Sequence, residues 1–337
     1  MKKIVFIFFV SLFNLNNCTA SNVSKLSSGT ASCFKEGEIA HEGVSCELSA
    51  FQYYKGKLLT ASDKEEGRVL VYDPKVLEAG GQKIPLSQDI ILPEPYKVAK
   101  VESMTTFHDW VIVVGSYIRT DLPQYCRIVA FKYDPLKNEA TQHHLVADAE
   151  IRKNIANFFD NAPYFKVEGA AIKPDAENTT EGTLYLGVRE AGEGYKEGEF
   201  KYYTRILSVR IKQEGDHLKL DPATWGLVYD MTDKNPEQGI SDLAYDQKTN
   251  YLYMTTSFEK NGKLDAALWR ISFADFFDKK DFTKLDGVSF DGLKIEGITL
   301  SEDGKIFLVA DQDRVPTGIE GKPRELYEAP YMVLKAK

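Results

Sequence analysis

The sequence has no excess of basic residues and, after its first twenty positions, no apolar run long enough to cross a membrane. Its 42 Lys and Arg residues stand against 50 Asp and Glu residues, which gives a formal net charge of -8. Proteins that bind nucleic acids carry a basic field that neutralises phosphates, so this balance argues against a nucleic-acid partner. It also disfavours an anionic membrane surface. We therefore expect no nucleic-acid partner and no transmembrane segment.

The sequence also lacks the motifs that name a reaction. It contains no pair of zinc-binding histidines on a helical pattern, no nucleophile elbow and no P-loop. Gly192, Gly194 and Gly198 do not have the spacing of a dinucleotide-binding fingerprint. No short motif therefore decides whether the protein is an enzyme.

Cysteine is scarce, with 4 residues in 337, and the first of them, Cys18, lies within a targeting segment. Lys2 and Lys3 precede an apolar stretch at residues 4–13, and Cys18-Thr19-Ala20 ends in small residues. This pattern is typical of a cleaved export signal at residues 1–20, and the apolar stretch is too short for a membrane-spanning helix. We expect a bacterial exported protein, periplasmic or extracellular. A lipid anchor at Cys18 is the alternative, because the preceding residues are similar to a lipobox.

After cleavage three cysteines remain, an odd number in a compartment that permits disulfides. A bridge between Cys33 and Cys46 would close a short loop and tie the N-terminal segment to the first structural repeat. A bridge between Cys46 and Cys126 is the alternative, and each of the three can also be a buried thiol.

A fivefold repeat is the main feature that is present. Each copy has an acidic residue, usually followed by glycine, then an apolar strand, a turn and a second apolar strand. The copies begin at Glu42, Glu102, Glu168, Asp242 and Glu296. Repeated units of short strands at this period are typical of propeller blades. We predict an all-β fold with a single β-propeller at residues 33–337, five blades being favoured over six.

The two ends of the predicted propeller differ in composition. Residues 21–32 are rich in Ser, Thr and Gly and are predicted to be a flexible tether. The fifth copy lacks a fourth strand at the C-terminus, and a circular array of sheets must close. We therefore expect residues 33–39 to supply the strand that closes the last blade. One helical excursion is expected at residues 148–159.

The repeat also predicts which face of the propeller carries function. In a blade of antiparallel strands the start of the first strand lies beside the end of the second, and the innermost strands line the channel. The acidic residues should therefore meet the second-strand ends at one mouth. The longest connections, at residues 190–202 and 311–330, follow on the same face, and long loops on a rigid scaffold often carry binding. The polar second-strand ends include Asp63, Tyr117, Arg189, Asp311, Asp313 and Arg314.

A ring of carboxylates at this mouth predicts a site for calcium or another divalent cation, since carboxylate oxygens are hard ligands and like charges repel without a cation or proton between them. Such an ion could activate water, with a second carboxylate as general base, while arginines suit an anionic group. The predicted metal ligands are Glu42, Glu102, Glu168, Asp242, Glu296 and Asp311. The predicted catalytic residues are Glu168, Arg189 and Glu296, and the predicted ligand contacts are Asp63, Tyr117, Arg189, Asp313 and Arg314.

A structural interpretation explains the same repeat. An acidic residue at a strand start can accept backbone hydrogen bonds that hold successive blades together, and it recurs because each blade meets the same structural problem. Arg189 then pairs with one of these carboxylates. The two interpretations can hold together.

Several segments taken together resemble a known family. They are Val167-Glu168-Gly169-Ala170-Ala171, Leu186-Gly187-Val188-Arg189, Gly239-Ile240-Ser241-Asp242-Leu243-Ala244-Tyr245 and Ile295-Glu296-Gly297-Ile298. They resemble a bacterial exported β-propeller family of unknown function that is similar to phytase-like esterase propellers. Those enzymes use calcium and channel carboxylates to hydrolyse phosphomonoesters. The resemblance thus implies a metal at Glu42, Asp63, Glu168, Glu296 and Asp311, with Arg189 near phosphate.

Two functions follow as expectations. One is a metal-assisted hydrolase, a phosphoesterase or lactonase, that acts on a small anionic molecule at the channel mouth. The alternative is a non-catalytic propeller that binds a small ligand, a glycan or another exported protein. In both cases we expect a monomer.

Overall fold

The computed structural model describes residues 22–37, 45–119, 121–177, 179–312 and 318–336. The predicted export signal lies outside these ranges, as do Glu42, Asp313 and Arg314. Within the described ranges, no helix is both long enough and apolar enough to cross a membrane.

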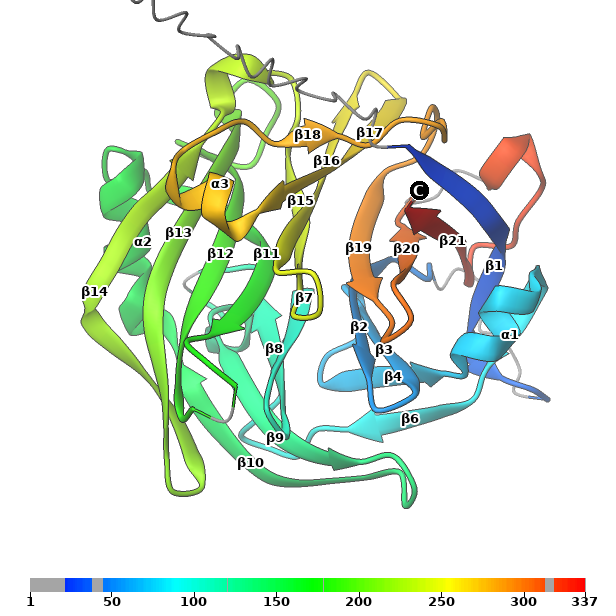
Figure 1. The fold of residues 1–337 in the computed structure, drawn as a ribbon, viewed down its shortest axis with the longest axis horizontal. Coiled ribbons are helices and arrows are strands. Elements are labelled where there is room, and N and C mark those ends of the chain that lie inside the picture. Colours follow the sequence, from blue (N-terminus) through cyan, green and yellow to red (C-terminus); the bar gives the residue numbers. More distant parts are fainter. Residues whose placement is uncertain (1–21, 38–44, 120, 178, 313–317, 337) are drawn as a thin grey trace, which may run out of the picture.

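Five sheets, antiparallel except for one parallel pair in blade five, are arranged around a central axis, which confirms the predicted five-bladed β-propeller (Figure 1). Blade one contains β2 (Leu48–Tyr54), β3 (Lys57–Ser62), β4 (Arg68–Tyr72) and β6 (Gln88–Ile91). Blade two contains β7 (Val101–Phe107), β8 (Trp110–Gly115), β9 (Ile128–Asp134) and β10 (Glu139–Ala147). Blade three contains β11 (Tyr164–Pro174), β12 (Glu181–Gly192), β13 (Phe200–Glu214) and β14 (His217–Asp230).

Blade four contains β15 (Gly239–Asp246), β16 (Tyr251–Lys260), β17 (Lys263–Ser272) and β18 (Thr283–Lys284). Blade five contains β19 (Ile295–Leu300), β20 (Lys305–Ala310), β21 (Glu328–Ala336), β1 (Val23–Lys35) and β5 (Gly81–Leu86). The first strand of each blade lies nearest the axis, and β2, β7, β11, β15 and β19 contact one another in a closed circle.

The N-terminal strand closes the propeller, but it begins earlier than the sequence predicts. Strand β1 pairs antiparallel with β21, with Thr30 opposite Pro330 and Ser32 opposite Glu328. Most of the predicted tether at residues 21–32 is therefore a strand, and the closing strand overlaps the predicted range 33–39 only at residues 33–35. The Ser, Thr and Gly content was misleading, because the free edge of β21 supplies backbone hydrogen bonds that require no apolar side chains.

Blade five also has a fifth strand that the sequence pattern did not reveal. Helix α1 (Pro74–Ala79) leads from blade one into β5, which pairs parallel with β1. Gly29 permits this close approach, since a Cβ atom built on it would lie 1.6 Å from the carbonyl oxygen of Gly81. Strand β1 is thus held on both sides.

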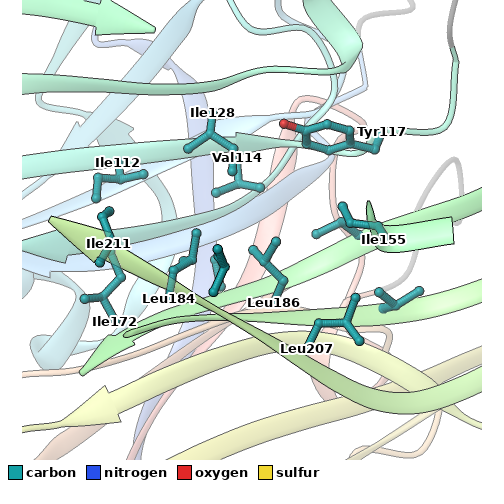
Figure 2. Close-up of a cluster of buried hydrophobic side chains, with 14 of the residues drawn as sticks. Ile112, Val114, Tyr117, Ile128, Ile155, Ile172, Leu184, Leu186, Leu207 and Ile211 are labelled. Carbon is teal, nitrogen blue, oxygen red and sulfur yellow. The ribbon is translucent and has the colours of Figure 1, made fainter. Parts of the chain in front are cut away.

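Apolar side chains fill the spaces between neighbouring blades. Figure 2 shows the cluster between blades two and three, where side chains from β8 and β9 face side chains from β11, β12 and β13. The predicted helical excursion is present here as α2 (Arg152–Ala156), flanked by single 3₁₀ turns, and it packs Ile155 into this cluster. Helix α3 (Phe273–Phe277) adds Phe273 and Phe276 to the cluster between blades three and four.

Cys33 and Cys46 form a disulfide, with their Cα atoms 5.9 Å apart, and Cys126 is a buried thiol. The first of the two predicted pairings is therefore the one formed. Since Cys33 lies in β1 and Cys46 lies just before β2, the bridge ties the closing strand to the first blade.

Removing this bridge should destabilise the closure of the propeller. We expect the double variant Cys33→Ala/Cys46→Ala to lower the free energy of unfolding by about 3 kcal/mol, because a cross-link over a loop of this length restricts the unfolded chain. Urea unfolding monitored by tryptophan fluorescence would measure the change. Cys126→Ser keeps the bridge and serves as the control, and an unchanged midpoint in the double variant would contradict the stabilising role.

Candidate functional site

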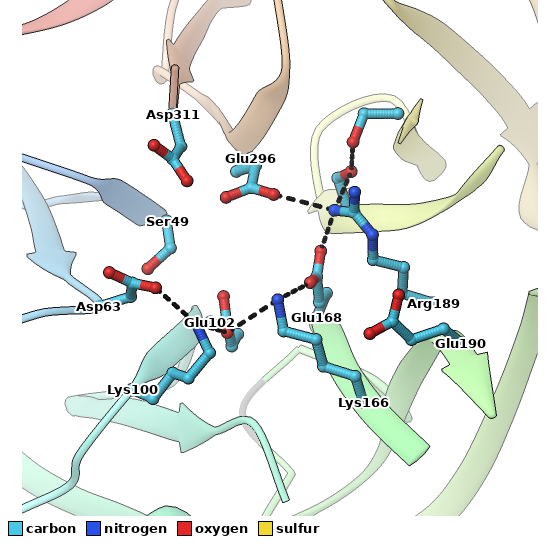
Figure 3. A network of polar contacts seen from close by, with 12 residues as sticks. Ser49, Asp63, Lys100, Glu102, Lys166, Glu168, Arg189, Glu190, Glu296 and Asp311 are labelled. Carbon is cyan, nitrogen blue, oxygen red and sulfur yellow. Dashed lines mark hydrogen bonds and ion pairs between the residues drawn. The ribbon is translucent and has the colours of Figure 1, made fainter. Parts of the chain in front are cut away.

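The first strand of every blade contains a β-bulge near its start, where its pairing with the second strand skips one residue. The skipped residues are Ser49 in β2, Glu102 in β7, Glu168 in β11, Ser241 in β15 and Glu296 in β19. A bulge leaves its extra residue unpaired and re-aims the side chain. Figure 3 shows four of these side chains pointing toward one another from separate blades. The bulges therefore bring one side chain per blade to the same mouth of the channel.

In two blades the bulge residue is not the acidic residue that the sequence repeat predicts. In blade one the bulge residue is Ser49, whereas the repeat had placed Glu42 there. In blade four it is Ser241, and the predicted Asp242 is the next residue along the strand. The channel mouth thus receives three glutamates and two serines from the inner strands.

Four basic side chains that the repeat did not include lie among these glutamates. Arg189 is the residue skipped by a second bulge, in β12. Three lysines each stand two residues before a bulge glutamate, in the triplets Lys100-Val101-Glu102, Lys166-Val167-Glu168 and Lys294-Ile295-Glu296. The triplet is visible in the sequence, but the predicted repeat begins at the acidic residue and so leaves out the lysine.

Ion pairs connect these groups across blade boundaries (Figure 3). Lys166 Nζ lies 3.1 Å from Glu102 Oε1 in blade two and also pairs with Glu168 of its own blade. Arg189 Nη1 lies 2.6 Å from Glu168 Oε2 and 2.8 Å from Glu296 Oε1 in blade five. Blades two, three and five are therefore joined by charge at their inner strands.

The pairing continues at both ends. Lys100 Nζ lies 3.2 Å from Glu102 Oε1 and 2.5 Å from Asp63 Oδ2, just after β3 of blade one. Lys294 Nζ lies 3.2 Å from Asp311 Oδ2, just after β20. We call the whole set the channel ion-pair chain, which contains in order Glu47, Lys64, Asp63, Lys100, Glu102, Lys166, Glu168, Arg189, Glu296, Lys294 and Asp311. Six carboxylates therefore alternate with five cations.

The middle of this chain is removed from water. Glu168 is 1% exposed and Arg189 is 3% exposed. A buried charge is costly unless it is paired, and here every buried carboxylate of the chain has a cationic neighbour. The predicted pairing of Arg189 with a ring carboxylate is confirmed, and it involves two of them.

The carboxyl groups of the chain differ in their pKa. Burial opposes ionisation of Glu296, but Lys294, Arg189 and Lys166 outweigh it and hold the pKa of Glu296 well below its usual range. Burial raises the pKa of Glu102 to about 7, although Lys100 and Lys166 act to lower it. Glu102 therefore changes charge near neutral pH while Glu296 stays ionised.

Asp242 lies deeper in the channel and holds inner strands together. Its Oδ1 accepts hydrogen bonds from Ser103 Oγ at 2.6 Å and from Leu243 N at 2.8 Å, and its Oδ2 accepts one from Ile298 N at 2.9 Å. Ser103 Oγ in turn accepts from Ala170 N at 2.9 Å. Burial raises the pKa of Asp242 well above its usual range, and these donors act to lower it. Four blades thus meet at one carboxylate, as the structural interpretation expects.

Close packing of inner strands explains the glycine that follows two of the bulge glutamates. A Cβ atom on Gly169 would lie 2.9 Å from Leu243 Cγ, and one on Gly297 would lie 3.0 Å from Phe51 Cβ. Each of these glycines therefore lets the inner strand of the neighbouring blade approach. The acidic residue thus supplies a charge at the channel mouth, and the adjacent glycine leaves room for the neighbouring strand.

The described residues do not fit the predicted divalent-cation site. Lysine or arginine groups already lie against the carboxylates of the chain, and Asp242 is occupied by hydrogen-bond donors. Among the residues that the structure describes, no group of three or more His, Cys, Asp or Glu side chains is placed to hold a metal ion. Calcium stays a prediction that rests on the sequence alone.

Tyr117 does not lie at the channel mouth as predicted. It is fully buried in the apolar cluster between blades two and three, beside Val114 and Ile155 (Figure 2). Of the predicted ligand contacts, Asp63 and Arg189 are at the mouth, and both are engaged in ion pairs.

A groove of about 700 Å³ lies next to the ion-pair chain, at the boundary of blades three and four. Phe200, Tyr202 and Phe258 line it. The Tyr202 ring lies 5.8 Å from the Arg189 guanidinium, and its hydroxyl donates to the carbonyl of Glu259 at 3.1 Å. The groove lies beside the loop predicted at residues 190–202. This loop is shorter than predicted, because β12 continues to Gly192 and β13 begins at Phe200.

Solved structures of low sequence identity are similar to this chain over most of its length. The catalytic domain of a GH62 alpha-L-arabinofuranosidase from Coprinopsis cinerea has a TM-score of 0.48 at 8% identity, covering 92% of this chain and 97% of that chain. A GH43 endo-arabinanase from Bacillus licheniformis has a TM-score of 0.43 at 10% identity, covering 89% and 96%. A luciferin-regenerating enzyme has a TM-score of 0.39 at 9% identity, covering 93% and 95%. These likenesses concern the fold and assign no activity.

No family model and no curated protein matches the chain. The resemblance to an exported propeller family and to phytase-like propellers therefore stays a prediction, and the β-propeller fold is what the structure establishes.

Neutralising Glu296, which stays ionised, should change the stability of the protein more than neutralising Glu102, whose pKa is raised. We expect Glu296→Gln to lower the free energy of unfolding by about 3 kcal/mol near neutral pH, because Arg189 and Lys294 each lose one of their carboxylate partners while they remain buried. The matched variant Glu102→Gln should cost about 1 kcal/mol or less, since an amide resembles the protonated carboxyl. Urea unfolding of both variants measures the difference, and equal losses would contradict it.

The pH dependence of stability follows from Glu102. Its pKa rises from 4.5 to about 7 on folding, so its protonated form stabilises the folded state fully below pH 4.5. This contribution is lost as the pH rises through about 7. We expect the free energy of unfolding to fall over this interval, by an amount that Glu102→Gln removes. Parallel slopes for wild type and variant would contradict the assignment.

Proposed function

We propose that the protein is a non-catalytic binding propeller that holds a glycan in the groove between blades three and four. The observation that carries this proposal is the contrast between the two parts of the functional face. The carboxylates of the channel ion-pair chain are satisfied by cations of the same chain, whereas the neighbouring groove is open and lined by aromatic rings.

The groove has the composition that a sugar ligand requires. Binding pockets combine apolar and aromatic walls with a few polar groups that fix orientation, and the volume of about 700 Å³ is in the usual range. Phe200 and Tyr202 lie on the same face of β13, with ring centroids 5.5 Å apart. Ring faces of this kind can pack against the apolar face of a sugar, while the charged side chains at the rim hydrogen-bond its hydroxyl groups.

The charge of the residues that line the groove favours a neutral glycan over the anionic substrate expected for a phosphoesterase. The charged residues lining the groove are Glu197, Lys201, Arg205, Asp230, Asp233, Glu237, Glu259 and Lys260. The acids outnumber the bases, so a phosphate group would be repelled there. Inside the channel, Arg189 already pairs with two carboxylates, whose negative charge would repel a phosphate group. A phosphoesterase or lactonase activity at the channel mouth thus has less support than binding in the groove.

Isothermal titration with a panel of neutral oligosaccharides tests the proposal. We expect saturable binding that Tyr202→Ala weakens by about tenfold or more, because a buried aromatic contact commonly dominates recognition. Tyr195→Ala is the matched control, since Tyr195 is 73% exposed on the adjoining loop and does not line the groove. Binding should not change when calcium is replaced by a chelator.

Two results would contradict this function. One is the absence of binding to every oligosaccharide of a broad panel. The other is calcium-dependent hydrolysis of a phosphomonoester or lactone that Tyr202→Ala leaves intact and Glu296→Gln abolishes in a folded protein.

A further inference from the structure

A second cavity, of about 290 Å³, opens at the other mouth of the channel. All five inner strands contribute to it, with Gln52 from β2, Thr105 from β7, Ile172 from β11, Ala244 from β15 and Thr299 from β19. The turns that join first and second strands complete the wall. These turns lie at the end of the channel opposite the bulges.

The spacing along the inner strands places the cavity relative to the ion-pair chain. In β7, Glu102 belongs to the chain, Ser103 bonds to Asp242, and Thr105 lines the cavity. In β19, Glu296 belongs to the chain, and Thr299 lines the cavity. The hydrogen bonds around Asp242 therefore lie between the two mouths, and the cavity is separate from both the ion-pair chain and the groove.

The lining of this cavity is polar but nearly without charge. Glu177 is the one Asp, Glu, Lys or Arg among the described lining residues, and it is exposed. Hydroxyl and amide groups come from Gln52, Thr105, Thr106 and Gln247. Such groups both donate and accept hydrogen bonds, which matches hydroxyl groups of a ligand better than phosphate, carboxylate or ammonium groups.

Thr105 gives the clearest indication of a ligand. It is 6% exposed, and within the described part of the chain its hydroxyl makes no hydrogen bond to another residue. By the two-residue period of a strand, it shares the inward face of β7 with Ser103, whose hydroxyl is fully used. A polar group that is buried against a cavity without a protein partner is available to a bound molecule.

We propose that this cavity is a second binding site, which takes one neutral, hydroxyl-rich molecule of monosaccharide size. Its volume is at the lower limit for small-molecule pockets and suits a single ring. The site does not depend on the groove function, because no lining residue is shared between the two.

Ligand-observed NMR and calorimetry with D-glucose, D-galactose, D-mannose and myo-inositol test the site on the whole purified protein. We expect saturable binding of at least one probe, with a dissociation constant of about 10 mM or lower. Thr105→Val removes the hydroxyl at nearly constant volume and should weaken binding by about tenfold. Thr105→Ser retains a hydroxyl and should bind within about threefold of wild type.

Tyr202→Ala distinguishes this site from the groove and should leave binding of the four probes unchanged. Melting curves of every variant show whether the fold is retained. The proposal is overturned if no probe binds at about 50 mM. It is also overturned if folded Thr105→Val binds like wild type, or if Tyr202→Ala alone abolishes binding.

Discussion

Compensation of buried charge at the channel is the constraint on which the inner part of this propeller depends. Five bulges turn side chains from separate blades toward one mouth, and three of those side chains are carboxylates. Without partners they would repel one another in a region that excludes water. Lys166 and Arg189 each bridge carboxylates of different blades, so the same contacts that neutralise the channel also fix how the blades meet.

The channel is organised in three levels along its axis. The ion-pair chain is at one mouth, the hydrogen bonds to Asp242 follow, and the neutral cavity is at the other mouth. The levels follow from one inner-strand pattern, because residues one and three positions after a bulge, such as Ser103 and Thr105 after Glu102, lie successively farther from the mouth with the ion-pair chain. The glycine at 169 or 297 belongs to the same pattern, since the neighbouring inner strand packs directly against it. Equivalent positions of the sequence repeat therefore lie at equivalent depths along the channel.

The sequence predicted the blades well because the apolar strands and turns recur with a constant period. It also placed Glu102, Glu168 and Glu296 at one mouth, where the structure has them. The prediction that Asp242 belongs to this ring is wrong, because Ser241 is the bulge residue of its strand. A bulge depends on strand register, and a shift of one residue changes which side chain enters the ring. The sequence predicts a tether at residues 21–32 and not a strand, because the partner strand β21 is distant in sequence and this segment has the composition of a linker.

The state of the channel carboxylates also determines where a ligand can bind. A molecule that separates Arg189 from Glu168 or Glu296 would break a buried ion pair, which is costly. The groove beside Tyr202 and the cavity beside Thr105 lie outside this part of the channel, so a ligand bound there leaves the pairs of Arg189 intact. The paired charges of the channel thus hold the scaffold together, and we propose that ligands bind on the adjoining surfaces, in the groove and in the cavity.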